Sequence, residues 1–526
     1  MSSRKIFSSR KFSKAALFTA VVLSASGACA ADAAPDTKAA SPSPLGIKED
    51  PKLDTKAQQA APTAFASAKP ESVDTFGKGD GKSYLIPAGE IVAEEFILNQ
   101  YDRHFIDAKV YGSSWNSFNR NVKGSWTVDT DPFNINQFAH PYQGSIYLGL
   151  ARSTGVDFWQ SMGYSFMGSA LWETAGETGN ANINDQYTTT VGGAFLGEPL
   201  FRMASLLLES GEGRPGFWQE LGATVISPGV GFNRYAFGDR FSGVFRSHNP
   251  AVYTRLQLGV NFSASVHSTV NLNPNVANAA VPQSYKTGQP TADFTMSYGL
   301  PGKSGYSYDR PFDYFHFEFA ADTGNAISTV LSRGLLYGTD YASGDNYRGI
   351  WGVYGNYDYI NAQLFRVSTS GVGVGTTGEG WLSRTIAWEG TALGSVGYGS
   401  AGTIRGIDQR DYHNGVTPQG LLASRFIFGD HAAFDFTLRD YHVSDIASGA
   451  TGGSEDIQRG DVSLTFRVFN LHGITLNYAA TRRDAVIPGQ SDTIQKVGAI
   501  SLAYTYLGHT RFGAVDWRPA SAGGPK

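Results

Sequence analysis

In the second half of the chain, apolar and polar residues alternate at every second position over long stretches. The alternation is clearest at residues 256–266, 315–319, 434–438, 462–468, 474–478 and 500–506. Successive side chains of a β-strand point to opposite faces, so each stretch has one apolar face and one polar face. Turn-rich segments lie between the stretches, at 271–289, 301–309, 370–380 and 448–453. The pattern predicts about twelve antiparallel strands.

A transmembrane β-barrel accounts for these strands better than a soluble β-sandwich, although both show the same alternation. The predicted strands are about 9–13 residues long, and tyrosines such as Tyr504 and Tyr506 lie at strand ends. Short turns alternate with longer polar loops, which is also typical of such barrels. About twenty residues follow Tyr506, and this tail departs from the usual aromatic C-terminal assembly signal. We nevertheless expect the barrel-assembly machinery as a partner.

A segment from Asp129 to Leu208 follows a helical period instead. Serine and glutamate recur at every fourth position from 161 to 177, so they form one polar stripe along a helix. We predict helices over residues 141–151 and 157–175, and a third helix from about residue 184 that Pro199 bends or splits. Gly193 and Gly197 on that third helix allow another backbone to approach closely.

The chain divides into five regions. They are a signal peptide, 1–30; a disordered linker, 31–73; strands or a short helix, 74–128; a helical segment, 129–210; and the barrel, 211–526. The signal peptide is recognised by its basic start, its short apolar run and its cleavage site. The linker is rich in alanine, proline and serine and has too few apolar residues to pack. We expect the helical segment in or under the lumen, where it acts as a plug.

Cysteine content and charge exclude several classes of function. The single cysteine, Cys29, lies in the predicted cleavage site, so the mature chain has no disulfide, thiolate metal site or cysteine nucleophile. The alternative is a lipoprotein that keeps Cys29 as its first residue, but Ser26 stands where such proteins usually have leucine. A net charge of −4 argues against nucleic acid as a partner. The mature sequence has no apolar run of about 18 residues, which argues against a helical membrane protein.

The helical segment carries a distinctive set of motifs. They read D-x-D-P-F-x-I-N-Q-F-x-H-P-Y-x-G from Asp129, followed by S-x-x-W-E, N-D and G-G-x-x-x-G-E, and cover roughly Trp126 to Arg202. The set resembles that of a family of bacterial outer-membrane proteins known only as a domain of unknown function. The resemblance implies a location in the cell outer membrane, with outer-membrane lipid or lipopolysaccharide as a partner, and it implies no particular reaction.

The same segment holds the polar residues that are candidates for a functional site. They are Asp129, Asp131, Asn136, His140, Glu173, Glu177, Asn184, Asp185, Glu198 and Arg202. One hypothesis is a structural network, in which Glu198 and Arg202 pair because they are four residues apart on a helix. Asp129 and Asp131 either cap the turn at Pro132 or offer oxygen ligands to calcium. No other metal or cofactor is predicted.

Two functions from different classes fit these residues. The first is a barrel that passes a small solute or supports the envelope structure, with a lumen lined by groups such as His316 and Glu318. The second is an enzyme that modifies outer-membrane lipid or lipopolysaccharide, with His140, Glu173 and Asp185 as candidate catalytic residues. The known G-x-S-x-G, H-E-x-x-H and P-loop motifs do not occur in the sequence. A soluble periplasmic binding protein is a third hypothesis.

Overall fold

The structure is a computed structural model. It describes residues 82–128, 131–211, 215–270, 288–323, 326–361, 365–403, 412–444, 453–486 and 492–508, together with residues 515 and 517. The predicted signal peptide, the predicted linker and Asp129 lie outside the described residues.

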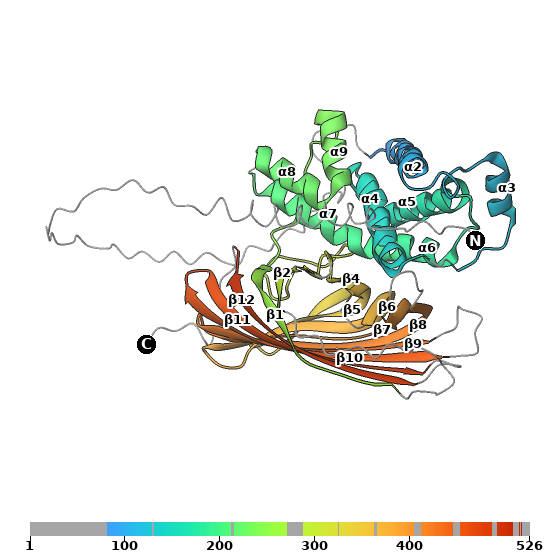
Figure 1. The fold of residues 1–526 in the computed structure, drawn as a ribbon. Coiled ribbons are helices and arrows are strands. Elements are labelled where there is room, and N and C mark those ends of the chain that lie inside the picture. Colours follow the sequence, from blue (N-terminus) through green and yellow to red (C-terminus); the bar gives the residue numbers. More distant parts are fainter. Residues whose placement is uncertain are drawn as a thin grey trace, which may run out of the picture.

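Twelve antiparallel strands close into a barrel in sequence order, and β1 pairs with β12 to complete the ring (Figure 1). The strands are β1 Val252–Val270, β2 Gly288–Tyr298, β3 Phe315–Asp322, β4 Thr329–Ser343, β5 Tyr347–Asn361, β6 Phe365–Trp381, β7 Ile386–Thr403, β8 Tyr412–Phe428, β9 Ala432–Ser444, β10 Ser454–Phe469, β11 His472–Val486 and β12 Thr493–Tyr506. The predicted barrel and its strand number are confirmed.

The alternation along the strands separates the lumen from the outer wall. On β1, Gln257 and Asn261 line the lumen, whereas Leu258, Val260 and Phe262 point outward and are exposed. The predicted turn at residues 370–380 is wrong, because this segment lies inside β6. Its many glycines reflect close strand packing rather than turns.

Eight α-helices precede the barrel in the described part of the chain. They are α2 Leu85–Phe105, α3 Trp115–Lys123, α4 His140–Ser153, α5 Phe158–Leu171, α6 Ile183–Tyr187, α7 Gly193–Glu209, α8 Phe217–Ile226 and α9 Pro228–Phe237. Three π-helical turns lie among them, η1 Ile135–Ala139, η2 Trp172–Gly176 and η3 Thr188–Gly192, and a 3₁₀ turn, η4 Gly238–Arg240, follows. We call residues 85–237 the helical block.

The helical block is longer than the sequence predicts, at both ends. For residues 74–128 the sequence analysis left strands or a short helix open. The described part of that region holds α2 and α3, so the strands are wrong and the helix is correct, although α2 is longer than expected. Pro87 did not prevent a helix, since it lies in the first turn of α2, where its missing N–H is not needed. The barrel begins at Val252 rather than near residue 211, because α8 and α9 come first.

The helical block lies against the outer wall of the barrel, so its predicted place in or under the lumen is wrong (Figure 1). Ser332 on β4 donates a hydrogen bond to the Phe195 carbonyl (2.5 Å), and the Tyr357 hydroxyl on β5 donates to the Gln137 carbonyl (2.6 Å). The next residue along β4, Arg333, lines the lumen. Ser332 therefore points outward, as successive residues of a strand must.

Outward-facing aromatic residues of β3 bury the contact. Phe315, Phe317 and Phe319 alternate with lumen-facing residues, yet all three are buried, in one cluster with Phe195 and Leu200 of α7. An unobstructed barrel would expose these three rings to its surroundings. The helices thus cover this part of the outer wall and bury its three aromatic rings.

Pro199 lies inside α7 and does not end it. A proline cannot donate to the carbonyl four residues earlier, which here is that of Phe195. Ser332 of the barrel wall supplies the missing donor at 2.5 Å. The prediction that Pro199 bends or splits the helix is therefore wrong as to the split, since α7 runs without interruption from Gly193 to Glu209.

Two helices of the block bury polar side chains and expose large apolar ones, although the block also has an apolar core. On α5, Ser161, Ser165 and Ser169 are buried, with Ser165 0% exposed, whereas Phe166 and Met167 are each 53% exposed. On α2, Glu95 and Asn99 are buried as well, and Val92, Phe96 and Ile97 are exposed, while Ile91 is the one large aliphatic side chain of this helix that is buried. The polar stripe predicted from the four-residue spacing is thus the inner face of α5.

Candidate functional site

A polar centre lies where α4, α6 and η2 meet inside the helical block. His140 opens α4, and its Nε2 atom lies 3.8 Å from Oδ2 of Asp185, which is buried on α6. Asn184 donates to Oδ1 of the same carboxylate at 2.7 Å. The structure therefore brings together three of the residues that the sequence analysis singled out, with a histidine and a carboxylate facing each other.

Glu173 belongs to the same centre through the loop that precedes α6. Its Oε2 accepts the backbone N–H of Asn182 (2.7 Å), and its carbonyl accepts the side chain of Asn121 (3.3 Å). Glu177 lies at the edge, where Oε1 accepts the indole N–H of Trp172 (3.1 Å). Glu173 thus holds the segment that carries Asn184 and Asp185.

A further carboxylate, Glu95 of α2, is buried beside this centre. Its Oε1 accepts hydrogen bonds from the hydroxyl of Tyr147 and from Gln143 (3.3 Å), and it lies within electrostatic range of Glu173. Its Oε2 has no hydrogen-bond partner among the described residues. The sequence analysis missed Glu95, although its spacing from Ile91 and Asn99 on one helical face was a signal.

Three π-helical turns surround the polar centre. One ends directly before His140, one contains Glu173, and one follows the helix that carries Asp185. Such turns are rare and occur frequently at functional sites, because they rotate side chains away from positions that a regular helix allows. The local backbone thus supports a role for these three residues.

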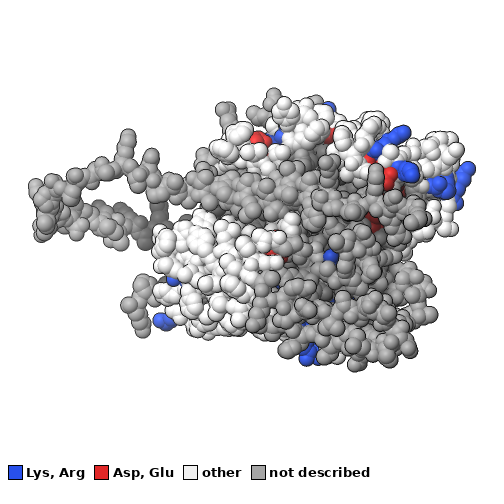
Figure 2. Space-filling view, viewed as in Figure 1, with Lys and Arg blue, Asp and Glu red and all other residues white. Residues whose placement is uncertain are grey.

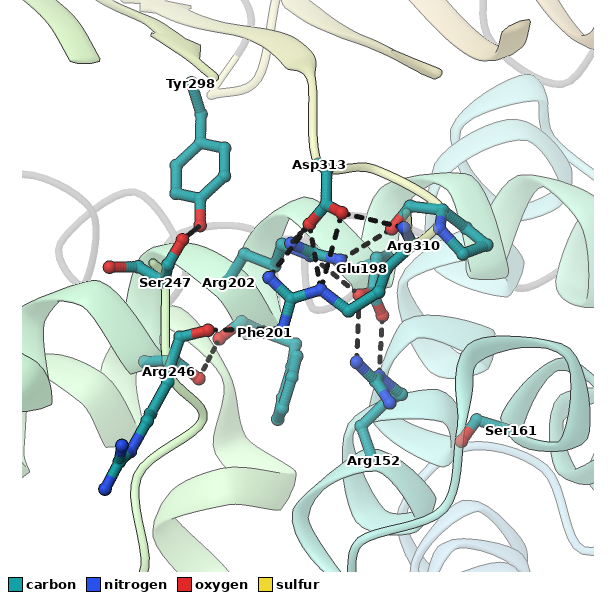
Figure 3. A network of polar contacts seen from close by, with 12 residues as sticks. Arg152, Ser161, Glu198, Phe201, Arg202, Arg246, Ser247, Tyr298, Arg310 and Asp313 are labelled. Carbon is teal, nitrogen blue, oxygen red and sulfur yellow. Dashed lines mark hydrogen bonds and ion pairs between the residues drawn. The ribbon is translucent and has the colours of Figure 1, made fainter. Parts of the chain in front are cut away.

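A second network joins the helical block to the start of the barrel (Figure 3). Glu198 is 0% exposed and accepts hydrogen bonds from Arg152 (2.8 and 3.1 Å) and from Arg202 (2.9 Å). Arg202 also bonds Asp313 (2.8 Å), which lies between β2 and β3 and is shared with Arg310. The predicted pairing of Glu198 with Arg202 is confirmed, while Arg152 and Asp313 were missed.

His248 lies near this network, in the connection that leads from the helical block to β1. Its partial burial and the nearby guanidinium of Arg310 lower the pKa of His248 below the ordinary value. The imidazole therefore adds no positive charge to the network at neutral pH.

Asn136 and Asp131 lie at the junction with the barrel wall, apart from the polar centre. Both contact Tyr412, the first residue of β8: Asn136 donates to its hydroxyl (3.0 Å), and that hydroxyl donates to the Asp131 carbonyl (2.5 Å). Among the described residues, no group of three or more His, Cys, Asp or Glu could hold a metal ion. The predicted calcium site involves Asp129, outside those residues.

The lumen holds a cavity of about 340 Å³ lined by charged residues, including His316 and Glu318 as predicted. Ion pairs cross it between strands that are not neighbours. Arg255 of β1 contacts Asp435 of β9 (3.4 Å), and Arg439 of β9 contacts Glu318 of β3 (3.5 Å). These contacts link opposite sides of the barrel across the lumen.

The solved structures that match part of this chain include a porin, a channel and a transporter, at 7–10% identity. The alignment with the NanC porin spans 47% of this chain and 98% of the porin chain, at 7% identity and a TM-score of 0.24. The alignment with the outer membrane channel DcaP of Acinetobacter baumannii spans 49% of this chain and 96% of the DcaP chain, at 9% identity and a TM-score of 0.23. The alignment with the toluene transporter TodX of Pseudomonas putida spans 51% of this chain and 91% of the TodX chain, at 10% identity and a TM-score of 0.20.

A comparison with curated proteins found no match. The family comparison concerns the helical block, from just before η1 to the first turn of α9. There, residues 125–229 match the family described as a domain of unknown function, DUF3943, which confirms the resemblance seen in their motifs.

Proposed function

We propose that the protein is an integral outer-membrane barrel that holds the helical block beside it within the bilayer, in an envelope-structural role. One observation carries this proposal: both parts expose many large apolar side chains on their outer surface and bury polar side chains inside, which in the helical block lie beside an apolar core. A protein surrounded by water has the opposite distribution. Membrane proteins place polar residues in the interior of a bundle or barrel.

The barrel shows the distribution on the strands that the helices leave uncovered. Phe466, Leu476 and Leu502 point outward from β10, β11 and β12, and each is more than half exposed. Tyr504 follows at the strand end, where the amphipathic ring of tyrosine suits the boundary between hydrocarbon and water. These exposed side chains support the proposal that an apolar belt on the outer wall contacts lipid.

The helical block continues the same belt. Val92, Phe96 and Ile97 on α2 are exposed, while Glu95 and Asn99 face inward. α2 has 21 residues, so it is about 31 Å long at 1.5 Å per residue, close to the thickness of the hydrocarbon core. Among the described residues, the run from Ile183 to Glu209 is the only one that is both long and apolar enough to cross a membrane, and 83% of its most apolar window is buried within the protein.

Basic residues gather at the end of the helical block that carries α3 (Figure 2). Arg103, Lys109 and Lys123 are exposed there, and Trp115 is exposed beside them. Tryptophan combined with lysine and arginine is typical of the membrane interface, where the cations meet lipid phosphates. This end therefore supports outer-membrane lipid or lipopolysaccharide as the partner.

Cysteine labelling tests this arrangement. In a Cys29→Ser background, a fluorescent bimane attached at Leu258→Cys on the barrel or at Phe166→Cys on α5 should be quenched by brominated lipid in reconstituted vesicles. Both side chains face outward, and contact with acyl chains brings the bromine atoms close. Fluorescence intensity with brominated and with ordinary lipid gives the measurement.

Two matched positions serve as controls. Gln257→Cys lies next to Leu258 but faces the lumen, and Asp345→Cys lies in the exposed turn between β4 and β5. Neither should be quenched. Equal quenching at Leu258 and Gln257 would remove the membrane barrel, and a Phe166 label that behaves like the Asp345 label would place the helical block in water.

An enzyme that modifies outer-membrane lipid is the second candidate. The polar centre favours it, because ionisable groups buried within a bilayer mark functional sites by default. His140 and Asp185 form a candidate acid–base pair, and Glu173 positions the segment that carries Asp185. The π-helical turns at these residues add to the support.

Lipid analysis separates the two candidates. His140→Ala and Glu173→Gln should each lower the heat stability of the barrel complex by about 1–3 kcal/mol, because each strands a buried polar partner. The lipid profile of the outer membrane, measured by mass spectrometry, should not change. A catalytic pair predicts instead that turnover falls by a factor of about 100 or more. A lipid species lost in both variants, while the barrel still resists SDS, would favour the enzyme.

A further inference from the structure

The lumen contains a row of polar residues that face the cavity side by side. Ser297 of β2, His316 of β3, Arg333 of β4 and Asn356 of β5 occupy directly paired positions on four neighbouring strands. The first three line the main cavity of about 340 Å³. Arg333 and Asn356 also line a small adjoining cavity of about 20 Å³. The barrel thus brings hydrogen-bond donors from separate strands to one place.

Arg333 differs from the other lumen arginines because it is not paired. Arg255, Arg425, Arg439 and Arg459 each contact a carboxylate. Arg333 is 8% exposed and has neither an ion pair nor a hydrogen bond among the described residues, and its Nε is buried. A buried guanidinium without a partner is costly, so such a group calls for an explanation.

The nearest acidic groups are occupied by other partners. Asp358 accepts the hydroxyl of Tyr441 (2.9 Å), and Glu318 contacts Arg439 (3.5 Å). Further donors beside Arg333 lack partners too, since Nδ2 of Asn356 and Nε2 of Gln419 are buried and unbonded among the described residues. Both line the small cavity together with Arg333. Three unused donors therefore face one space.

We infer that Arg333, Asn356 and Gln419 form a binding site for a small oxyanion, a phosphate or a carboxylate, within the lumen. An arginine fork and two amide donors match the acceptor oxygens of such an anion. Arg333 lines both cavities, so an anion in the main cavity of about 340 Å³ meets this guanidinium first, and Asn356 and Gln419 line the small cavity that adjoins it. The site is independent of the lipid-facing surface, so it stands whether or not the helical block lies in the bilayer.

Equilibrium dialysis of the full-length protein in detergent, with radiolabelled inorganic phosphate, tests the site; a parallel arm uses succinate. Ionic strength is held constant with a bulky sulfonate buffer. The wild type should bind one or both anions saturably at one site per chain. Arg333→Gln should bind at least about tenfold more weakly, because a hydrogen bond to a charged group is lost. Asn356→Ala should weaken binding by a smaller factor.

Lys496→Gln provides the matched control, because it removes the same charge from an exposed, outward-facing position of β12. It should bind like the wild type. Thermal unfolding gives a second readout: an anion at about five times its dissociation constant should raise the wild-type Tm by about 2–4 °C and leave Arg333→Gln unchanged. No saturable binding by the wild type, or equal responses of the wild type, Arg333→Gln and Lys496→Gln, would overturn the proposal.

Discussion

Replacing Glu198 by alanine is expected to cost the folded protein about 3–5 kcal/mol, a large effect for a single side chain. Glu198 is 0% exposed and lies between the guanidinium groups of Arg152 and Arg202. Its removal leaves Arg152 buried without its carboxylate and Arg202 with Asp313 alone. Urea unfolding, followed by the heat-modifiable mobility of the barrel on gels, measures the loss.

The pair between Glu220 and Arg234 is the control for this change. It has similar bidentate geometry, at 2.7 and 2.8 Å, but the Glu220 side chain is 38% exposed. Water screens such a pair, so Glu220→Ala should cost only about 0–1 kcal/mol. Equal losses of stability in the two variants would show that burial does not determine how much the network in Figure 3 contributes to folding.

Replacing Gly193 by alanine should destabilise the helical block by roughly 1–3 kcal/mol through overpacking. A Cβ atom at this position would lie 2.6 Å from the Cα of Gly144 on α4. Both partners are backbone, so neither side chain can move aside. The same unfolding experiment measures the effect, and a looser α4–α7 contact should also increase protease cleavage within the block.

Gly163→Ala on α5 is the matched substitution. Nothing lies within 4 Å of a Cβ at this position, and alanine favours a helix over glycine by up to about 1 kcal/mol. Gly163→Ala should therefore leave stability unchanged or raise it. A destabilisation as large as that of Gly193→Ala would mean that glycine is needed for a reason other than the close approach of α4 and α7.

Local spacing in the sequence was enough to predict several features of the fold. The period of two identified the barrel strands, and the period of four placed Ser161, Ser165 and Ser169 on one inner face of α5. The pairing of Glu198 with Arg202 and the close approach at Gly193 also follow from spacing along one helix. In each case the interacting groups are near in sequence, or repeat along one element.

The position of the helical block was not predictable in the same way. Hydropathy averages detect helices that are apolar all round, whereas α2 and α5 are apolar on one face only. Whether such a face meets lipid, a barrel or water depends on contacts between distant segments, such as Arg202 with Asp313. One signal was present: Ser332 and Ser370 stand at outward positions of the barrel, where lipid contact would favour apolar residues.

The polar centre was predicted in part. His140, Glu173 and Asp185 were singled out from motifs. The structure adds Glu95, which comes from a region that the sequence analysis left open between strands and a short helix. Without α2, the pattern showed no carboxylate beside Glu173. Because α2 was left open in this way, the carboxylate that it contributes to the polar centre was missed.

The proline in α7 also sets the order in which the protein is assembled. The carbonyl of Phe195 gains its hydrogen bond from Ser332, 137 residues later in the chain. A buried carbonyl left without a donor costs about 1–3 kcal/mol, so α7 is complete only once β4 lies beside it. The chain order places α7 before β4. The N-terminal helices therefore reach their full stability only after this part of the barrel has formed.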